Sequence, residues 1–91
     1  MRTFSFNVNV ETRTDTGEVL AVYFRFRDGK SAKTREFADG NVFADYDRGG
    51  SLLGIELLAP CSLAVLERIV RPVTARRFVR QTIPSSMLAP A

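Results

Sequence analysis

Apolar and polar residues alternate with a period of two over the first part of the chain. Between residues 3 and 11 every second position is apolar, namely Phe4, Phe6, Val8 and Val10. Such alternation is typical of a β-strand with one buried and one solvated face. It predicts a first strand over residues 3–11. A turn over residues 13–17 follows, in which Gly17 is free to adopt positive φ.

Further strand-length runs follow, separated by turn residues. They cover residues 18–27, 32–37, 41–46 and 52–58. Asp28-Gly29 and Asp39-Gly40 are strong signals for two-residue hairpin turns, and the sequence from Asp47 to Gly50 supplies a third turn. Consecutive hairpins predict an antiparallel meander of about five strands. The third of these strands is polar, which suits an edge or a solvent-facing position.

The same alternation assigns residues to the two faces of the sheet. In the second strand Leu20, Val22, Phe24 and Phe26 share one face. Tyr23 lies on the other face of that strand, and Phe43 is its counterpart on the fourth strand. Both faces of the predicted sheet therefore carry large apolar or aromatic side chains.

Helical spacing replaces the alternation after Pro60. The pattern predicts a helix over residues 63–70, capped by Ser62, and a second helix over residues 75–82, capped by Thr74. Together these elements predict a single α+β domain over residues 1–83. Residues 84–91 are expected to form a loose C-terminal tail.

Two short helices can cover only one face of a five-stranded sheet. A second copy of the same sheet is the simplest cover for the other face, so we expect a homodimer in which Tyr23 and Phe43 contribute to the interface.

The length and composition narrow the class of protein. With 91 residues, of which 45% are hydrophobic and 25% charged, the chain is expected to form one globular domain. A single cysteine excludes an internal disulfide framework and fits a reducing compartment. No signal-peptide pattern opens the chain, and no apolar run is long enough to cross a bilayer. We therefore expect a soluble, cytoplasmic protein without a membrane partner.

Positive charge gathers near the C-terminus. The net charge is +3, and residues 66–91 contain one acidic residue, Glu67, against five arginines: Arg68, Arg71, Arg76, Arg77 and Arg80. We take Arg76, Arg77 and Arg80 as candidate partner-binding residues. The alternatives are a solvated helix face, an acidic protein partner, nucleic acid or acidic lipid. No aromatic residue is interleaved among these arginines in a way that would stack bases.

Residues suited to catalysis or metal binding are scarce. The chain has no histidine, the side chain used most often for acid–base work near neutral pH. Cys61 lies just before the start of a predicted helix, where the dipole could lower its pKa, but a structural role fits it better. Asp39, Asp45 and Asp47 could hold a divalent cation, although aspartate is also a common turn residue.

The remaining polar residues also favour a structural explanation. Glu56 and Arg25 are expected to form a cross-strand surface pair rather than a catalytic dyad. The sequence therefore predicts neither an enzyme nor a cofactor or metal site.

The middle of the chain resembles the bacterial domain of unknown function 2283 family. The resemblance covers about residues 17–58 and rests on Ala21-Val22-Tyr23-Phe24-Arg25-Phe26, Asp28-Gly29-Lys30, Asp39-Gly40, Asp45-Tyr46-Asp47 and Leu53-Gly54-Ile55-Glu56-Leu57-Leu58. Many members carry a Tyr-Asp pair before the second strand, which is absent here, and many end soon after the Gly-Ile-Glu strand. The resemblance implies no activity. Some members look as though they lie beside small toxin-like proteins, which implies at most an antitoxin-like role.

Two hypotheses of different classes follow. The first is a non-catalytic protein-interaction module acting as a homodimer. The alternative is a nucleic-acid-associated or antitoxin-like regulator that uses the C-terminal arginines.

Overall fold

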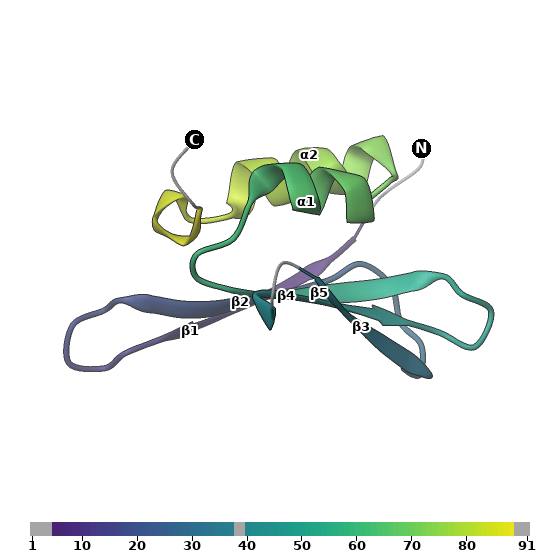
Figure 1. Ribbon diagram of the computed structural model, residues 1–91, viewed down its shortest axis with the longest axis horizontal. Coiled ribbons are helices and arrows are strands. Elements are labelled where there is room, and N and C mark those ends of the chain that lie inside the picture. Colours follow the sequence, from purple (N-terminus) through teal and green to yellow (C-terminus); the bar gives the residue numbers. More distant parts are fainter. Residues whose placement is uncertain (1–4, 38–39, 89–91) are drawn as a thin grey trace.

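A five-stranded antiparallel sheet carries a layer of helices on one side (Figure 1). The structure is a computed structural model and describes residues 5–37 and 40–88. The strands are β1 (Asn7–Thr12), β2 (Val19–Arg25), β3 (Lys33–Phe37), β4 (Val42–Tyr46) and β5 (Leu52–Leu58). The helices are α1 (Leu63–Ile69), α2 (Val73–Thr82) and the short 3₁₀ helix η2 (Ser85–Met87). This confirms the predicted α+β class, with five strands followed by two helices.

The order of the strands differs from a simple meander. The sheet has the order β1-β2-β5-β4-β3, so β2 pairs with β5 and not with β3. The expected hairpin at Asp28-Gly29 is therefore wrong, and residues 26–32 form a longer connection. The physical reason lies in composition: β5 is apolar except for Glu56 and suits the centre of the sheet, whereas the exposed, polar β3 suits an edge.

The connection between β2 and β3 is held by polar contacts near its start. The Phe26 backbone N–H donates to the Leu53 carbonyl at 2.8 Å. The Arg25 guanidinium donates to the Gly29 carbonyl at 2.6 Å. Arg25 is therefore engaged with this loop, and among the described residues it forms no ion pair with Glu56, which corrects the expected cross-strand pair.

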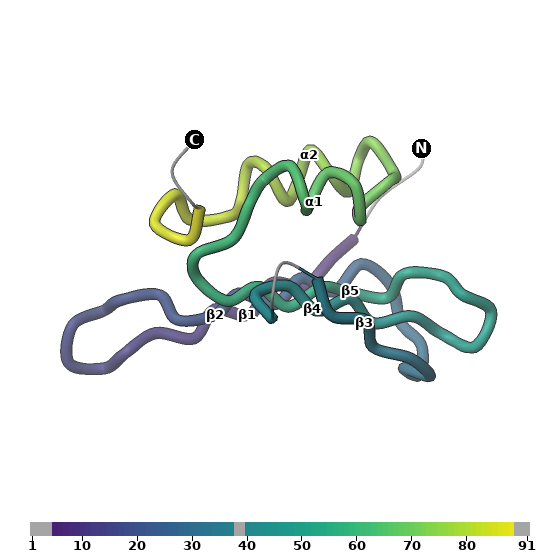
Figure 2. The backbone as a smooth tube through the Cα atoms, in the orientation of Figure 1, coloured from purple at the N-terminus to yellow at the C-terminus, as the bar shows by residue number. Residues whose placement is uncertain are grey.

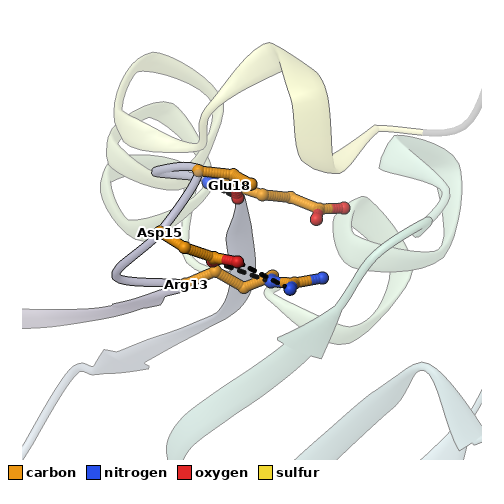
Figure 3. A network of polar contacts seen from close by, with 4 residues as sticks. Arg13, Asp15 and Glu18 are labelled. Atoms are coloured by element: carbon orange, nitrogen blue, oxygen red, sulfur yellow. Dashed lines mark hydrogen bonds and ion pairs between the residues drawn. The ribbon is translucent and has the colours of Figure 1, made fainter.

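The other predicted turns are confirmed. Between β1 and β2, Gly17 has φ 74° and its N–H donates to the Arg13 carbonyl, while the Arg13 guanidinium pairs with Asp15 (Figure 3). Gly40 follows β3 with φ 91°, and β3 pairs with β4 as a hairpin requires; Asp39 itself lies outside the described residues. Asp47 accepts the Ser51 N–H through its side chain at 2.8 Å and closes the β4–β5 turn.

The core lies between the sheet and the helical layer. Its fully buried residues from the strands occupy the face predicted to be apolar, and they are Val22, Phe24, Val42, Ala44, Ile55 and Leu57. The helices and the segment beyond them add Leu66, Val70, Ala75, Val79, Ile83 and Met87. Val8 of β1 and Phe6 just before β1 pack against this core, and Phe4 lies outside the described residues.

The helix boundaries agree with the sequence pattern to within one residue, except at the N-terminus of α2. α2 begins at Val73 after Pro72, two residues earlier than expected, so Thr74 lies inside the helix and does not cap it. Ser62 stands at the N-cap of α1 but its side chain makes no capping hydrogen bond. Proline tolerates the position before a first turn because the N–H groups there have no intrahelical partner.

The segment expected to be a loose tail is packed as far as it is described. Met87 is fully buried, and its carbonyl accepts the Cys61 N–H at 2.8 Å. Residues 89–91 lie outside the described part of the chain. Residues 84–88 therefore fasten the end of the helical layer to the link that leads from β5 to α1 (Figure 2).

None of the helices formed by the described residues combines the length and the apolar character that crossing a lipid bilayer requires.

Candidate functional site: a basic groove beside the helical layer

A groove of about 1140 Å³ lies between α1 and the β3 edge of the sheet. Residues of β3, β4 and the start of β5 line one wall, and residues of α1 and of the link to α2 line the other. The groove exists because the helical layer stops short of this edge, which leaves part of the apolar face of the sheet uncovered.

The floor of this basic groove is apolar and includes three aromatic side chains. Its apolar side chains from the sheet and the loop after β2 are Phe26, Phe37, Tyr46 and Leu52, and those from the helices are Val65, Ile69 and Ala75. All of these except Ala75 are only partly buried, although they pack against the core. Partly exposed aromatic side chains in a concave surface are a common feature of binding sites for another molecule.

The rim of the groove is strongly basic. Its ionisable side chains include six cations, namely Arg27, Lys33, Arg35, Arg48, Arg68 and Arg71, and one carboxylate, Asp47. The Arg35 guanidinium lies over the Phe37 ring, 5.5 Å from its centroid, which holds one cation directly above the aromatic floor. Like charges gathered around one groove raise the local positive potential, and an anionic partner relieves it.

The sequence could not reveal this cluster as a unit. The six cations are spread from residue 27 to residue 71, on β3, in the loops after β2 and β4, on α1 and in the link after α1. Only Arg68 and Arg71 belong to the arginine-rich C-terminal part that the charge pattern singled out. The only signal for the others was the polarity of β3, which alone indicates just an edge strand.

The three arginines predicted to bind a partner take different positions, and none lines the groove. The Arg80 guanidinium pairs with the Glu67 carboxylate of α1. Arg76 is half-buried, and its Nε has no hydrogen-bond partner among the described residues. Arg77 is exposed. The arginines of α2 thus include one that links the two helices and one that faces solvent.

Tyr23 and Phe43 do lie on the face of the sheet away from the helices, as predicted. Strand pairing places them in one row with the sequence Asn9, Tyr23, Glu56, Phe43 and Glu36 from β1 to β3. We call this side the open face. Carboxylates alternate with aromatic rings along the row, so it is less apolar than expected.

Gly54 shapes the open face next to this row. A Cβ atom there would lie 2.5 Å from the Phe24 carbonyl oxygen and 2.8 Å from Tyr23 Oη. Because glycine leaves this space empty, the Tyr23 ring lies across β5 and its hydroxyl donates to Asp45 Oδ2 on β4 at 3.2 Å. Thr34 on β3 donates to the other oxygen of Asp45 at 2.6 Å.

This network changes the acidity of Tyr23. Burial of the phenol raises its pKa above the ordinary 10.0, and the nearby Asp45 carboxylate adds to the rise, while a hydrogen bond with Arg25 opposes it. Tyr23 is therefore neutral at physiological pH and donates its hydrogen bond to Asp45, and with Thr34 the network joins β2, β4 and β3.

Cys61 is a packed thiol. It is buried, its Sγ donates to the Met87 carbonyl at 3.4 Å, and burial raises its pKa above the ordinary 9.0. The suggested lowering of its pKa by the α1 dipole is therefore wrong, because removal of water from the thiol dominates.

The aspartates considered as metal ligands do not converge within the described part of the chain. Asp45 binds Tyr23 and Thr34, and Asp47 binds the backbone of its own turn. Asp39 lies outside the described residues, and the described residues contain no group of three or more side chains suited to hold a metal ion.

A comparison with protein families identifies the central segment. Residues 18–59, which run from β2 through β5, match the family model described as "Protein of unknown function (DUF2283)". The segment belongs to this family. No curated protein and no solved structure matches the chain. The DUF2283 segment supplies one wall and part of the floor of the basic groove, whereas α1, which supplies the other wall, follows the matched residues.

Proposed function

We propose that this protein is a non-catalytic interaction module that binds an acidic segment of another protein in the basic groove. The observation that carries the proposal is the combination of an apolar, aromatic floor with six cations and one carboxylate around it. Interfaces are enriched in aromatic residues and arginine, and charge complementarity steers the partner to the correct surface.

The chemistry of the groove supports a non-catalytic role. Its one carboxylate, Asp47, already accepts a backbone N–H of its own turn. The remaining ionisable groups are arginines, a lysine and Tyr46, and none of these is paired with a base in the way that nucleophilic catalysis requires.

The experiment compares two variants with the same change in net charge. Arg35→Glu/Arg71→Glu reverses one cation on each wall of the groove, and Lys30→Glu/Arg77→Glu reverses two exposed cations that do not line it. Each tagged protein is purified gently from its own cells, and the mass of the eluted complex is measured by native mass spectrometry. We expect a stoichiometric acidic protein with the wild type and the control variant, and its loss with the groove variant.

Two results would contradict the proposal. Retention of the partner by Arg35→Glu/Arg71→Glu would place binding elsewhere. Loss of the partner from Lys30→Glu/Arg77→Glu but not from the groove variant would assign binding to the exposed α2 arginine or to the loop before β3.

A nucleic-acid-associated or antitoxin-like regulator is the second candidate. The observation in its favour is that Phe26, Phe37 and Tyr46 lie among the groove cations, an arrangement that suits stacked bases. This candidate requires affinity for a single-stranded oligonucleotide that falls steeply with salt and is abolished in the groove variant. No binding at low salt would eliminate it.

The proposal includes self-association through the open face, with Tyr23 and Phe43 at its centre. Both side chains are partly exposed there, which supports an interface. Two copies meeting face to face also bring Glu36 and Glu56 of each copy together, so this contact should strengthen with salt, whereas binding in the groove should weaken. Light scattering after gel filtration at low and high salt tests it, and a monomer under both conditions would refute it.

A further inference from the structure

The shape of the basic groove restricts what it can hold. The helical layer covers part of the sheet with two helices side by side (Figure 1). The groove is lined by residues of α1 and of β3, so it lies between this layer and the β3 edge. An α-helix with its side chains is about 10–12 Å wide and rises 1.5 Å per residue, so each residue occupies about 140 Å³. A groove of about 1140 Å³ therefore has room for about two helical turns.

The distribution of charge across the groove is two-sided. Arg68 and Arg71 stand on the helical wall, and Lys33 and Arg35 stand on the strand wall. The apolar lining residues also come from both sides, with Phe37, Tyr46 and Leu52 from the strands and Val65 and Ile69 from α1. A ligand that fits must therefore present an apolar stripe toward the floor and negative charge along both flanks of that stripe.

We infer that the occupant of the groove is an amphipathic α-helix of the partner, with carboxylates on both sides of its apolar stripe, which lies beside α1 as a third helix of the layer. This inference rests on the proposed function and specifies its partner. A helix suits the site because sheets of this kind bury their apolar face under packed helices, and here part of that face is still uncovered. Docking of an amphipathic helix in a groove is also a common mode of peptide recognition.

An added β-strand is the main competitor within the same partner class. β3 is an edge of the sheet, and no strand formed by residues 5–37 and 40–88 pairs with its outer side. Such a strand would extend the sheet and leave the aromatic floor beside α1 exposed, whereas a helix covers it. The floor thus favours the helix.

The experiment uses two labelled synthetic peptides of about 14 residues and equal composition. One has leucines at helical spacing with glutamates on both flanks, and the other has leucines and glutamates in strict alternation, the pattern of a strand. Affinity is measured by fluorescence anisotropy with the full chain, and helix content by circular dichroism. We expect the helical peptide to bind at least tenfold tighter and to gain helicity when bound.

The variants separate this inference from the proposed function. Arg35→Glu/Arg71→Glu should weaken binding of the helical peptide at least tenfold, and Lys30→Glu/Arg77→Glu should change it less than threefold. Equal or tighter binding of the alternating peptide, or no binding of either peptide, contradicts the inference that the occupant is a helix. If the peptides give this result but Arg35→Glu/Arg71→Glu still loses the protein captured from cells, the groove binds an acidic partner that is not a helix. If that variant retains the captured protein, the proposed function itself fails.

Discussion

The two faces of the sheet meet opposite environments, although the same strands build both. The face toward the helices is fully apolar where they cover it and becomes a basic groove where they stop. On the open face, the strand residues include the carboxylates Glu11, Glu36, Asp45 and Glu56 against one arginine, Arg25. The comparison teaches that the modest net charge conceals two surfaces of opposite sign, which should respond oppositely to salt and to charged partners.

The largest expected difference between the faces concerns stability. Phe24 is fully buried under the helices, and Phe43 is only half-buried on the open face. We expect Phe24→Ala to lower the free energy of unfolding by about 3–5 kcal/mol, because it leaves a cavity, and Phe43→Ala to lower it by about 1 kcal/mol. Urea denaturation of both variants measures this. Equal losses would mean that a partner copy buries Phe43.

A smaller loss of stability is expected at Gly54, which has no side chain to separate the backbone of β2 from the Tyr23 ring. Replacing this glycine by alanine places a methyl group against the Phe24 carbonyl and the Tyr23 ring, which should cost about 1–3 kcal/mol. This exceeds the gain of about 0.5–1 kcal/mol that alanine brings to a strand by restricting the unfolded chain.

Gly49→Ala is the matched control for this substitution. A Cβ atom on Gly49 would have its nearest contact at 3.5 Å, so thermal unfolding should shift little. A Gly54→Ala protein as stable as the control would show that the Tyr23 ring does not need to lie across β5.

The smallest effect is the dependence of stability on high pH. Because the pKa of Tyr23 is raised in the folded protein, folding favours the neutral phenol. The stabilisation is complete below the ordinary pKa of 10.0 and is lost as the pH rises through the higher, folded value. Absorbance titration of Tyr46→Phe, which leaves Tyr23 as the single tyrosine, measures the shift.

Removing the partner of the phenol gives a control for this titration. In Tyr46→Phe/Asp45→Asn the carboxylate is absent, so the pKa of Tyr23 should fall back toward 10.0, though burial should keep part of the shift. An unchanged titration would contradict the contribution of Asp45.

The strands and their faces could be predicted because alternation is a local property. The buried positions Val22, Phe24, Val42 and Ala44 follow directly from it. The pairing of β2 with β5 could not be predicted from turn signals, because Asp28-Gly29 has the residues of a hairpin turn while the partner of β2 lies far along the chain. What decides this pairing is burial: the sheet is more stable with its most apolar strand in the centre.

The groove escaped prediction for a related reason. Charge analysis along the sequence finds contiguous arginines such as Arg76 and Arg77, but Lys33, Arg35, Arg68 and Arg71 converge only after the sheet and α1 have packed. The contiguous arginines carried the clearest sequence signal and yet lie outside this concave surface.

The central position of β5 also has a consequence for how the protein assembles. The hairpins β1–β2 and β3–β4 are local units that can form early. They do not pair with each other, because β5 lies between them and pairs with β2 on one side and β4 on the other. While the chain is being synthesised, two unpaired strand edges therefore wait until residue 58 has emerged. Such edges invite pairing with other chains, so the interval before β5 arrives is the period of greatest risk of aggregation.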